Sequence, residues 1–386
     1  MWEIIRAVND RGHVGKKMRI FSLLLVFVIT FFGGCAGLDG NGRAGIQTPP
    51  EAGWHSASIS GQQKFTMVFD ELFNTVTIVI AYAESQDEFD YFAALIYDRM
   101  EELHRLYDIY HEYEGVNNLY TINQNAGLAP VQVEKEIIDM LLLSRFGYEL
   151  TDGVVNIALG PVLRIWSDYR AEGSELPTPE MLEKAAQITE MDELIIDEVT
   201  GTVFLRKLGM SLDVGSVAKA YATQLAVKEA VAAGLSSVLV SAGGNIISFG
   251  KPLDGVRERW SIGIKDPDYR KSDDIIDTVF LADLTVSCSG GYERYYLVDG
   301  QSYHHIIDPV TLMPANRYKQ VTVIHENAAL ADILSTALFI IPFEEGARLA
   351  ESVNAEVLWI DMDGRWQATA GYREMSKELS GYSSVD

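Results

Sequence analysis

The stretch over residues 213–250 constrains the fold of this chain more than any other segment. A glycine turn at Gly215 leads into residues 217–233, whose apolar spacing predicts an amphipathic helix. Gly234 stands just past that helix, at the position where a left-handed residue commonly ends one. Residues 237–240 are rich in β-branched and apolar side chains, and they predict a strand. The segment therefore predicts a helix joined closely to a strand, against which the rest of the chain must pack.

The turn at Gly215 has two interpretations. A glycine turn that leads into a helix presents unpaired backbone N–H groups, which can bind an anion such as a phosphate. Lys219 lies in the first helical turn, where the helix dipole favours a negative charge, and a bound anion would offset that cost. The alternative is an ordinary strand–helix–strand unit with a glycine after its helix. This segment alone leaves both interpretations open.

Composition indicates a folded domain and argues against one class of partner. Of the 386 residues, 48% are hydrophobic, which suffices for a large core, and the length allows one large domain or two smaller ones. The formal net charge of -24 argues against nucleic acid, because a phosphate backbone would be repelled.

Helical and strand patterns are mixed along the chain, and no internal repeat interrupts them. Helices are predicted at residues 87–110, 134–150, 217–233, 328–339 and 343–354, with a further helix capped by Thr178 and a buried loop with a short helix at 153–166. Strands are predicted at residues 75–82, 193–197, 202–206, 237–240, 260–265, 278–281, 292–298, 320–325, 357–360 and 366–369. This order predicts an α+β fold with mixed or antiparallel sheets and packed helices.

The N-terminal segment has the pattern of an exported lipoprotein. Basic residues precede an apolar run over residues 20–32, and two glycines then precede Cys35. The run is short for a membrane span. We expect a lipidated Cys35 that anchors the protein to the extracytoplasmic face of a bacterial cell membrane; a simple anchor or an uncleaved signal is the alternative. The predicted parts are a signal peptide with an N-terminal extension at 1–34, Cys35 with a flexible tether at 35–62, one folded domain at 63–373 and a loose tail at 374–386. Cys288 is the only other cysteine, so the fold must rest on its core.

Two further groups of residues are candidates for chemistry. His304 and His305 stand shortly before Asp308, and a histidine near its ordinary pKa can move protons or contact phosphate. The alternative is that the pair makes only structural hydrogen bonds.

The second group lies within one predicted helix. Asp332, Ser335 and Thr336 are spaced so that their oxygens lie on one helix face, and oxygen ligands suit Mg²⁺. The alternative is an acid with neighbouring hydroxyls on a solvated face.

Taken together, these segments resemble the ApbE family, the FAD:protein FMN transferases, over roughly residues 65–371. The motifs that carry the resemblance are Phe73-Asn-Thr75, Gly153 to Trp166, Asp213 to Tyr221, Ser241-Ala-Gly-Gly-Asn245, Ser289-Gly-Gly-Tyr-Glu-Arg-Tyr295, His305-Ile-Ile-Asp-Pro309 and Ala331 to Thr336. The resemblance implies a single ApbE-like domain of the T-fold type.

The resemblance also implies a role for each matched residue. Mg²⁺ would be held by Asp332, Thr336, the nearby Ser335 and the backbone carbonyl of Ser216. His305 would be catalytic or would orient the phosphate. The FAD site would be lined by Phe73, Tyr110, Val154, Val155, Asn156, Asp213, Lys219 and Ile307. Three positions depart from the family pattern, namely Val155, Asn156 and Gly291, and they bear on flavin affinity.

The activity implied by the resemblance is Mg²⁺-dependent transfer of FMN from FAD to a Thr or Ser hydroxyl of an acceptor flavoprotein, with release of AMP. Two other functions remain open. One is a Mg²⁺-dependent FAD pyrophosphatase, in which water replaces the protein hydroxyl. The other is a non-catalytic FAD-binding lipoprotein.

Overall fold

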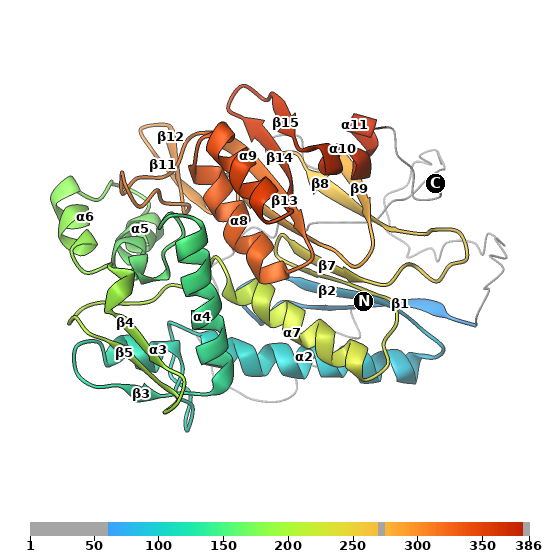
Figure 1. Ribbon diagram of the computed structural model, residues 1–386, viewed down its shortest axis with the longest axis horizontal. Coiled ribbons are helices and arrows are strands. Elements are labelled where there is room, and N and C mark those ends of the chain that lie inside the picture. Colours follow the sequence, from blue (N-terminus) through green and yellow to red (C-terminus); the bar gives the residue numbers. More distant parts are fainter. Residues whose placement is uncertain (1–60, 269–274, 381–386) are drawn as a thin grey trace, which may run out of the picture. The chain divides into compact units, whose positions relative to one another are not determined.

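An eight-stranded antiparallel sheet forms the centre of the fold (Figure 1). The computed structural model describes residues 61–268 and 275–380, all within one unit that spans residues 47–386. The strands, in their order across the sheet, are β1 (Gln63–Phe69), β2 (Thr77–Ala83), β6 (Val238–Ala242), β7 (Asn245–Phe249), β10 (Thr285–Gly290), β13 (Tyr318–His325), β14 (Glu356–Asp361) and β15 (Trp366–Ala368). The predicted signal peptide, Cys35 and nearly all of the predicted tether lie outside the described residues.

Helices cover one face of this sheet. They are α2 (Gln86–Tyr107), α7 (Ala218–Ala232), α8 (Ala328–Ile340) and α9 (Phe343–Ser352). Alanines along α7 let it approach α2 closely, and Val79 and Val240 of the sheet pack into the same core as Ile96 of α2. Helix α8 is buried along almost its whole length because it packs on β10 and β13 as well as on α7. The predicted helix at 217–233 is therefore confirmed, and Gly234 ends it with φ of 117°.

The other face of the sheet is covered by a hairpin and by the C-terminal helices. The hairpin consists of β8 (Trp260–Lys265) and β9 (Ile275–Leu281), and it packs with α10 (Ala370–Met375) and α11 (Lys377–Ser380). The prediction of a loose tail from residue 374 is wrong for residues 374–380. Buried Asp277 of β9 accepts hydrogen bonds from the Tyr372 and Ser376 hydroxyls, which fixes these helices to the hairpin.

Smaller elements complete the domain. A three-stranded sheet of β3 (Val131–Gln132), β5 (Thr202–Leu205) and β4 (Leu194–Asp197) packs with α3 (Leu119–Gln124) and α4 (Lys135–Leu150). Helices α5 (Gly160–Glu172) and α6 (Pro179–Ala186) share another core with the hairpin β11 (Tyr295–Val298) and β12 (Gln301–His304). Short 3₁₀ turns lie at η1 (Ile157–Leu159) and η2 (Met191–Glu193).

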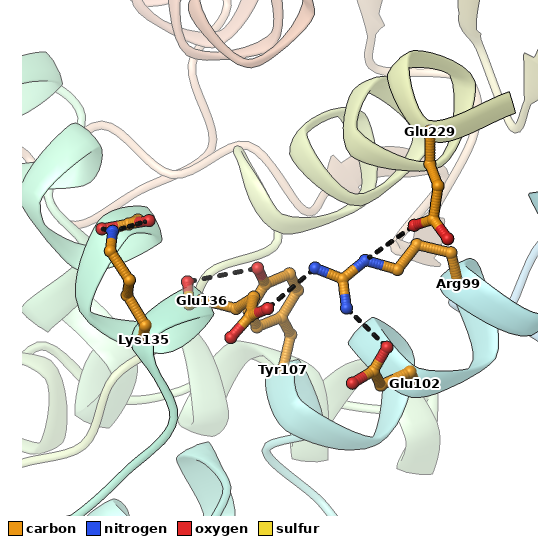
Figure 2. A network of polar contacts seen from close by, with 7 residues as sticks. Arg99, Glu102, Tyr107, Lys135, Glu136 and Glu229 are labelled. Atoms are coloured by element: carbon orange, nitrogen blue, oxygen red, sulfur yellow. Dashed lines mark hydrogen bonds and ion pairs between the residues drawn. The ribbon is translucent and has the colours of Figure 1, made fainter. Parts of the chain in front are cut away.

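A charged network ties three helices together. Figure 2 shows Arg99 of α2 between Glu136 of α4 and Glu229 of α7, with N–O distances of 2.8 and 3.6 Å. Glu102 also pairs with Arg99, and the Tyr107 hydroxyl donates to the backbone carbonyl of Glu136 at 3.2 Å. The guanidinium suits this arrangement because it presents several N–H donors in one plane.

The predicted α+β class is confirmed, with antiparallel sheets and packed helices. Three strands of the central sheet, β1, β7 and β10, were not predicted. Across the described residues, no helix is both long and apolar enough to span a lipid bilayer.

Candidate active site

A group of buried polar side chains lies where α8 crosses β7 and β10. Asp332 is 8% exposed, and its Oδ1 accepts a hydrogen bond from the Ser287 hydroxyl at 2.9 Å. Ser287 Oγ also lies 2.7 Å from Asn245 Oδ1, since the two residues stand opposite each other on β10 and β7. Within the described part of the chain, Asp332 Oδ2 and Asn245 Nδ2 are buried and have no partner at hydrogen-bond geometry. Burial raises the pKa of Asp332, and Lys219, Ser287 and the nearby Asn245 amide act in the opposite direction. A buried carboxylate oxygen without a partner is costly, and it indicates a missing cation or donor.

The two hydroxyl residues that follow Asp332 have different surroundings. Ser335 is fully buried, and its hydroxyl lies within hydrogen-bond distance of Ser287, Ser289 and the carbonyl of Asp332. Thr336 is partly exposed, and no side-chain hydrogen bond joins it to another described residue. The predicted set on α8 is therefore present, with Ser335 engaged inside the protein and Thr336 available to a ligand.

Lys219 brings a positive charge to the same place. Its Nζ donates to the carbonyls of Ala242 and Gly243 at 3.1 Å each, in the turn between β6 and β7. A cation in the first turn of α7 is unfavourable, because it lies near the positive end of the helix dipole. The two carbonyls offset part of this cost, so a bound anion is not needed to explain all of it. Burial lowers the pKa of Lys219, and the nearby Asp332 carboxylate opposes that shift.

The turn before α7 is held by hydrogen bonds of its own. Asp213 Oδ1 accepts from the N–H of Gly215 at 2.9 Å, which fixes the turn that carries Ser216. Helix α7 begins without a side-chain cap, and the N–H groups of Val217 and Ala218 donate instead to the Val214 carbonyl at 3.0 and 2.9 Å. An anion could therefore use only the later N–H groups of the first turn. Burial raises the pKa of Asp213, and the Gly215 N–H, Arg294 and Arg170 act in the opposite direction.

His304 and His305 have separate roles in the structure. His304 Nδ1 accepts from the N–H of Ile306 at 3.2 Å, so its Nε2 carries the proton that it donates to the Ala315 carbonyl at 2.7 Å. His305 Nδ1 is buried and has no partner among the described residues. Burial lowers the pKa of His305 to about 3, and Arg294 and His304 add to this effect. His305 is therefore neutral at physiological pH, with a free ring nitrogen.

The residues predicted to line the FAD site differ in how far they are exposed. Tyr110 is exposed, and it lies within the electrostatic reach of Asp213, Arg294 and Arg170. Phe73 has a positive φ of 53°, which is uncommon outside glycine, and its N–H donates to His104 Nδ1 at 3.3 Å.

The remaining residues predicted to line the FAD site have side chains that are mostly buried or hydrogen-bonded within the protein. Val155 and Ile307 are each buried in a hydrophobic core. Val154 packs against the core that contains Val155 and against the core around α8. Asn156 caps η1 by accepting from the N–H of Ala158 at 2.8 Å, and its amide donates to the Thr189 carbonyl at 2.8 Å. Among these positions Asn156 therefore has a clear structural role.

Gly291 is explained by its contact with His304. A Cβ added at Gly291 would lie 2.7 Å from Cδ2 of the His304 ring, closer than carbon atoms approach in proteins. The ring cannot easily move away, because both of its nitrogens are hydrogen-bonded. The departure of Gly291 from the family pattern therefore fits the position of His304.

The sequence analysis assigned no role to four residues that lie near this site. Arg294 and Asn245 lie inside quoted motifs, so their positions offered a signal. Ser287 and Arg170 lie outside every motif, and no local pattern marks them. Arg294 influences the pKa values of Asp213, Lys219 and His305, which places a cation among the predicted site residues.

Neither a cluster of metal-ligating side chains nor the cavity found in the described residues points to a second site for the predicted chemistry. The described ranges contain no group of three or more His, Cys, Asp or Glu side chains suited to a metal, so a metal here would have Asp332 as its main charged ligand. A cavity of about 510 Å³ lies elsewhere, between α2 and β3, and its walls include Glu101, Arg105 and Asn117 but none of the predicted site residues.

Comparisons with known proteins identify the family of this chain. The model of the ApbE family matches residues 73–359. The FAD:protein FMN transferase of Treponema pallidum (strain Nichols) is 34% identical over 268 residues, which are 66% of this chain and 73% of the relative. That of Klebsiella pneumoniae (strain 342) is 29% identical over 268 residues, with 69% and 82% covered.

Solved structures show the same fold. The ApbE protein of Thermotoga maritima aligns with a TM-score of 0.73 at 28% identity, covering 81% of this chain and 99% of that one. The flavin transferase ApbE of Vibrio cholerae aligns with a TM-score of 0.69 at 23% identity, covering 81% and 99%. With a family match over most of its length and a relative above 30% identity, this chain belongs to the ApbE family.

Proposed function

We propose that this protein transfers FMN from FAD to a Thr or Ser hydroxyl of an acceptor flavoprotein, releases AMP and depends on Mg²⁺. The name FAD:protein FMN transferase, carried by the relatives, supports the flavin transfer. The observation that carries the metal dependence is Asp332 Oδ2, a buried carboxylate oxygen that has no partner among the described residues.

The residues around Asp332 fit a Mg²⁺ ion. Mg²⁺ takes oxygen ligands, few of which need come from the protein. Asp332 Oδ2, the Thr336 hydroxyl and the Ser216 carbonyl are the oxygens we assign to it, with Ser335 behind them. When bound, the ion would offset the negative charge of the pyrophosphate and of the leaving AMP.

The positive groups of the site suit a dianionic pyrophosphate. Lys219 and the uncapped start of α7 supply local positive potential, and Arg294 adds to it. This local charge is needed because the whole chain has a formal net charge of -24, which repels an anion at long range. Tyr110, which lies within the electrostatic reach of Asp213 and Arg294, offers an aromatic surface to the flavin or adenine ring, and Phe73 is the second aromatic residue that we assign to it.

His305 is the group we assign to the acceptor hydroxyl. Its Nδ1 has no partner among the described residues, and the low pKa keeps the ring neutral at neutral pH, so Nδ1 would be an acceptor in the tautomer with its proton on Nε2. It would accept the hydrogen bond of the attacking hydroxyl and take up its proton, or hand it to solvent. A bond forms between the hydroxyl oxygen and the FMN-side phosphorus, the bond from that phosphorus to the AMP oxygen breaks, and AMP leaves with the electron pair.

One experiment separates transfer from its alternatives. The protein is incubated with FAD and Mg²⁺, with and without an acceptor domain, and the products are separated by mass spectrometry and liquid chromatography. Transfer predicts a flavinylated acceptor and an equal amount of AMP, both abolished by EDTA. Release of FMN and AMP without the acceptor would indicate a pyrophosphatase, and bound but intact FAD would indicate a binding protein.

We also propose that the enzyme works at the extracytoplasmic face of a bacterial membrane. The support is the sequence before residue 36, where basic residues, an apolar run and two glycines precede Cys35. Acceptor proteins would then be exported or membrane-bound.

A further inference from the structure

Three serine hydroxyls form a buried line that ends at Asp332. Ser289 Oγ lies 2.8 Å from Ser335 Oγ, and Ser335 Oγ lies 3.2 Å from Ser287 Oγ. Ser287 Oγ lies 2.9 Å from Asp332 Oδ1. Strand β10 contributes Ser287 and Ser289, whose side chains share one face because they are two residues apart, and α8 contributes Ser335 between them.

Each hydroxyl has one hydrogen, which limits how this line can be arranged. Ser287 has two acceptors within reach, Asp332 Oδ1 and Asn245 Oδ1, but can donate fully to only one. An ionised carboxylate is the stronger acceptor. The Ser287 hydrogen therefore points to Asp332 while that carboxylate is charged. Ser335 donates its own hydrogen to the backbone carbonyl of Asp332 at 3.0 Å, so its oxygen is left to accept from a neighbouring serine.

The line matters because Asp332 has a competing partner. Lys219 lies close enough to oppose the effect of burial on the pKa of Asp332, yet no ion pair joins the two side chains in the described ranges. Lys219 Nζ is instead held by the carbonyls of Ala242 and Gly243. If the carboxylate were free to rotate, it could pair with this lysine. Oδ2 would then no longer be available to bind a metal.

We propose that Ser287 is a positioning residue that holds Asp332 Oδ1, so that Oδ2 stays turned toward the Mg²⁺ site and away from Lys219. This inference rests on the proposed function. Ser287 does not touch the metal or FAD in this assignment, and it acts only through Asp332. Changing a group that orients a metal ligand typically weakens metal binding by about 10- to 100-fold.

The test compares two buried serines on adjacent strands. Ser287→Ala removes the hydroxyl that orients Asp332. Ser248→Ala is the matched control, because Ser248 on β7 is also buried and its hydroxyl donates to the Leu284 carbonyl at 2.9 Å, outside the site. Ser287→Thr keeps a hydroxyl at the first position. Thermal unfolding of each full chain shows what each change does to stability.

Metal binding is measured directly by titrating Mn²⁺ into the full chain with saturating FAD and no acceptor, followed by electron paramagnetic resonance. We expect Ser287→Ala to raise the Kd for Mn²⁺ by about 10- to 100-fold. Ser248→Ala should keep the wild-type Kd despite any loss of stability, and Ser287→Thr should recover most of the affinity. The KM for FAD, measured in the transfer assay with acceptor and with enough Mg²⁺ to saturate each variant, should stay unchanged in all three.

Two results would overturn the proposal. One is a wild-type Mn²⁺ affinity in folded Ser287→Ala. The other is an equal loss of affinity in Ser248→Ala, which would mean that general destabilisation is responsible. Failure of the proposed function is distinguishable, because it would appear as wild-type protein that binds Mn²⁺ and FAD but modifies no acceptor.

Discussion

His304 Nε2 donates to the backbone carbonyl of Ala315 at 2.7 Å, and this bond separates the role of His304 from that of its neighbour. The His304 ring also packs edge-on against Phe339 of α8, with ring centroids 5.5 Å apart. His304 therefore holds the segment before the site against the core, while His305 keeps a free nitrogen.

His305→Ala is expected to slow FMN transfer by about 10²- to 10⁴-fold, the usual contribution of a proton-transfer group. FAD binding should be largely kept. The rates are measured with saturating FAD and Mg²⁺, and FAD binding is measured by calorimetry. His304→Ala should lower the melting temperature but change the transfer rate of the folded protein little. Similar small losses of rate in both variants would remove His305 from the mechanism, and a collapse of FAD binding would make it structural.

Asp332→Asn and Asp332→Ala should abolish metal-dependent transfer while the fold survives. The loss should exceed about 10³-fold, because several kcal/mol of charge stabilisation by the metal would be removed. Transfer assays with added Mg²⁺, together with circular dichroism, measure both parts. Full activity of either variant, or of wild-type protein in EDTA, would contradict the assignment.

The stability of the protein should fall with decreasing pH partly because of His305. Its folded pKa is about 3 and an unfolded histidine has a pKa of about 6.5, so acid favours the unfolded chain. This contribution to stability is complete above about pH 6.5 and is lost progressively as the pH falls toward about 3. The groups that influence it are Arg294, His304 and Arg170.

The measurement is urea unfolding of wild type and His305→Gln between these pH values. The variant should show a smaller loss of unfolding free energy across the window, because glutamine does not titrate. Parallel curves for the two proteins would mean that His305 is protonated in the folded state as readily as in the unfolded chain.

Asp277→Ala should destabilise the C-terminal helices. The carboxylate accepts from the hydroxyls of Tyr372 and Ser376 at 3.0 and 2.7 Å and from the N–H of Glu378 at 3.2 Å. Hydrogen bonds to a charged group are worth about 1.5–3 kcal/mol each, so we expect a loss of about 3 kcal/mol or more. Denaturant unfolding and proteolysis near residue 376 measure it, with exposed Asp363→Ala as the control. Unchanged protease resistance would contradict this role.

Cys35→Ser should release the protein from the membrane fraction of cells that export it. The reason is that a lipid on Cys35 would be the main attachment of the chain to the bilayer. Fractionation followed by immunoblotting measures it, and Cys288→Ser serves as the control because Cys288 is the only other cysteine. A variant that stays in the membrane, with no processing of the wild type, would contradict lipidation.

The sequence predicted the helices of this fold better than the strands that carry the site. Helix α8 follows an apolar run bounded by Asn327 and Pro342, so its limits were readable. Strand β10 was missed because its buried face carries Ser287 and Ser289. A buried strand face is usually apolar, so these serines hid the strand in the sequence. Strand β7 was missed because Asn245 follows two glycines and resembles the end of a strand.

Contacts between distant segments account for the other differences. The C-terminal helices depend on Asp277, which lies 99 residues from Ser376 in the sequence. Ser287 could not be assigned a role, because its hydrogen bonds reach Asn245 and Asp332 at 42 and 45 residues' separation. The charged and hydroxyl residues of α8 were readable because helical spacing alone places them together.

The pairing of β2 with β6 has a consequence for how the chain folds. Thr77 of β2 lies opposite Ala242 of β6, so the N-terminal hairpin gains its inner neighbour only after about 160 further residues have been synthesised. Contacts over such separations slow folding, because a long loop must close before they form. While it waits, strand β2 has one unpaired edge, and in an unfinished chain such an edge favours association with other chains. Chaperone binding to nascent chains shorter than residue 242 is therefore expected to centre on this hairpin.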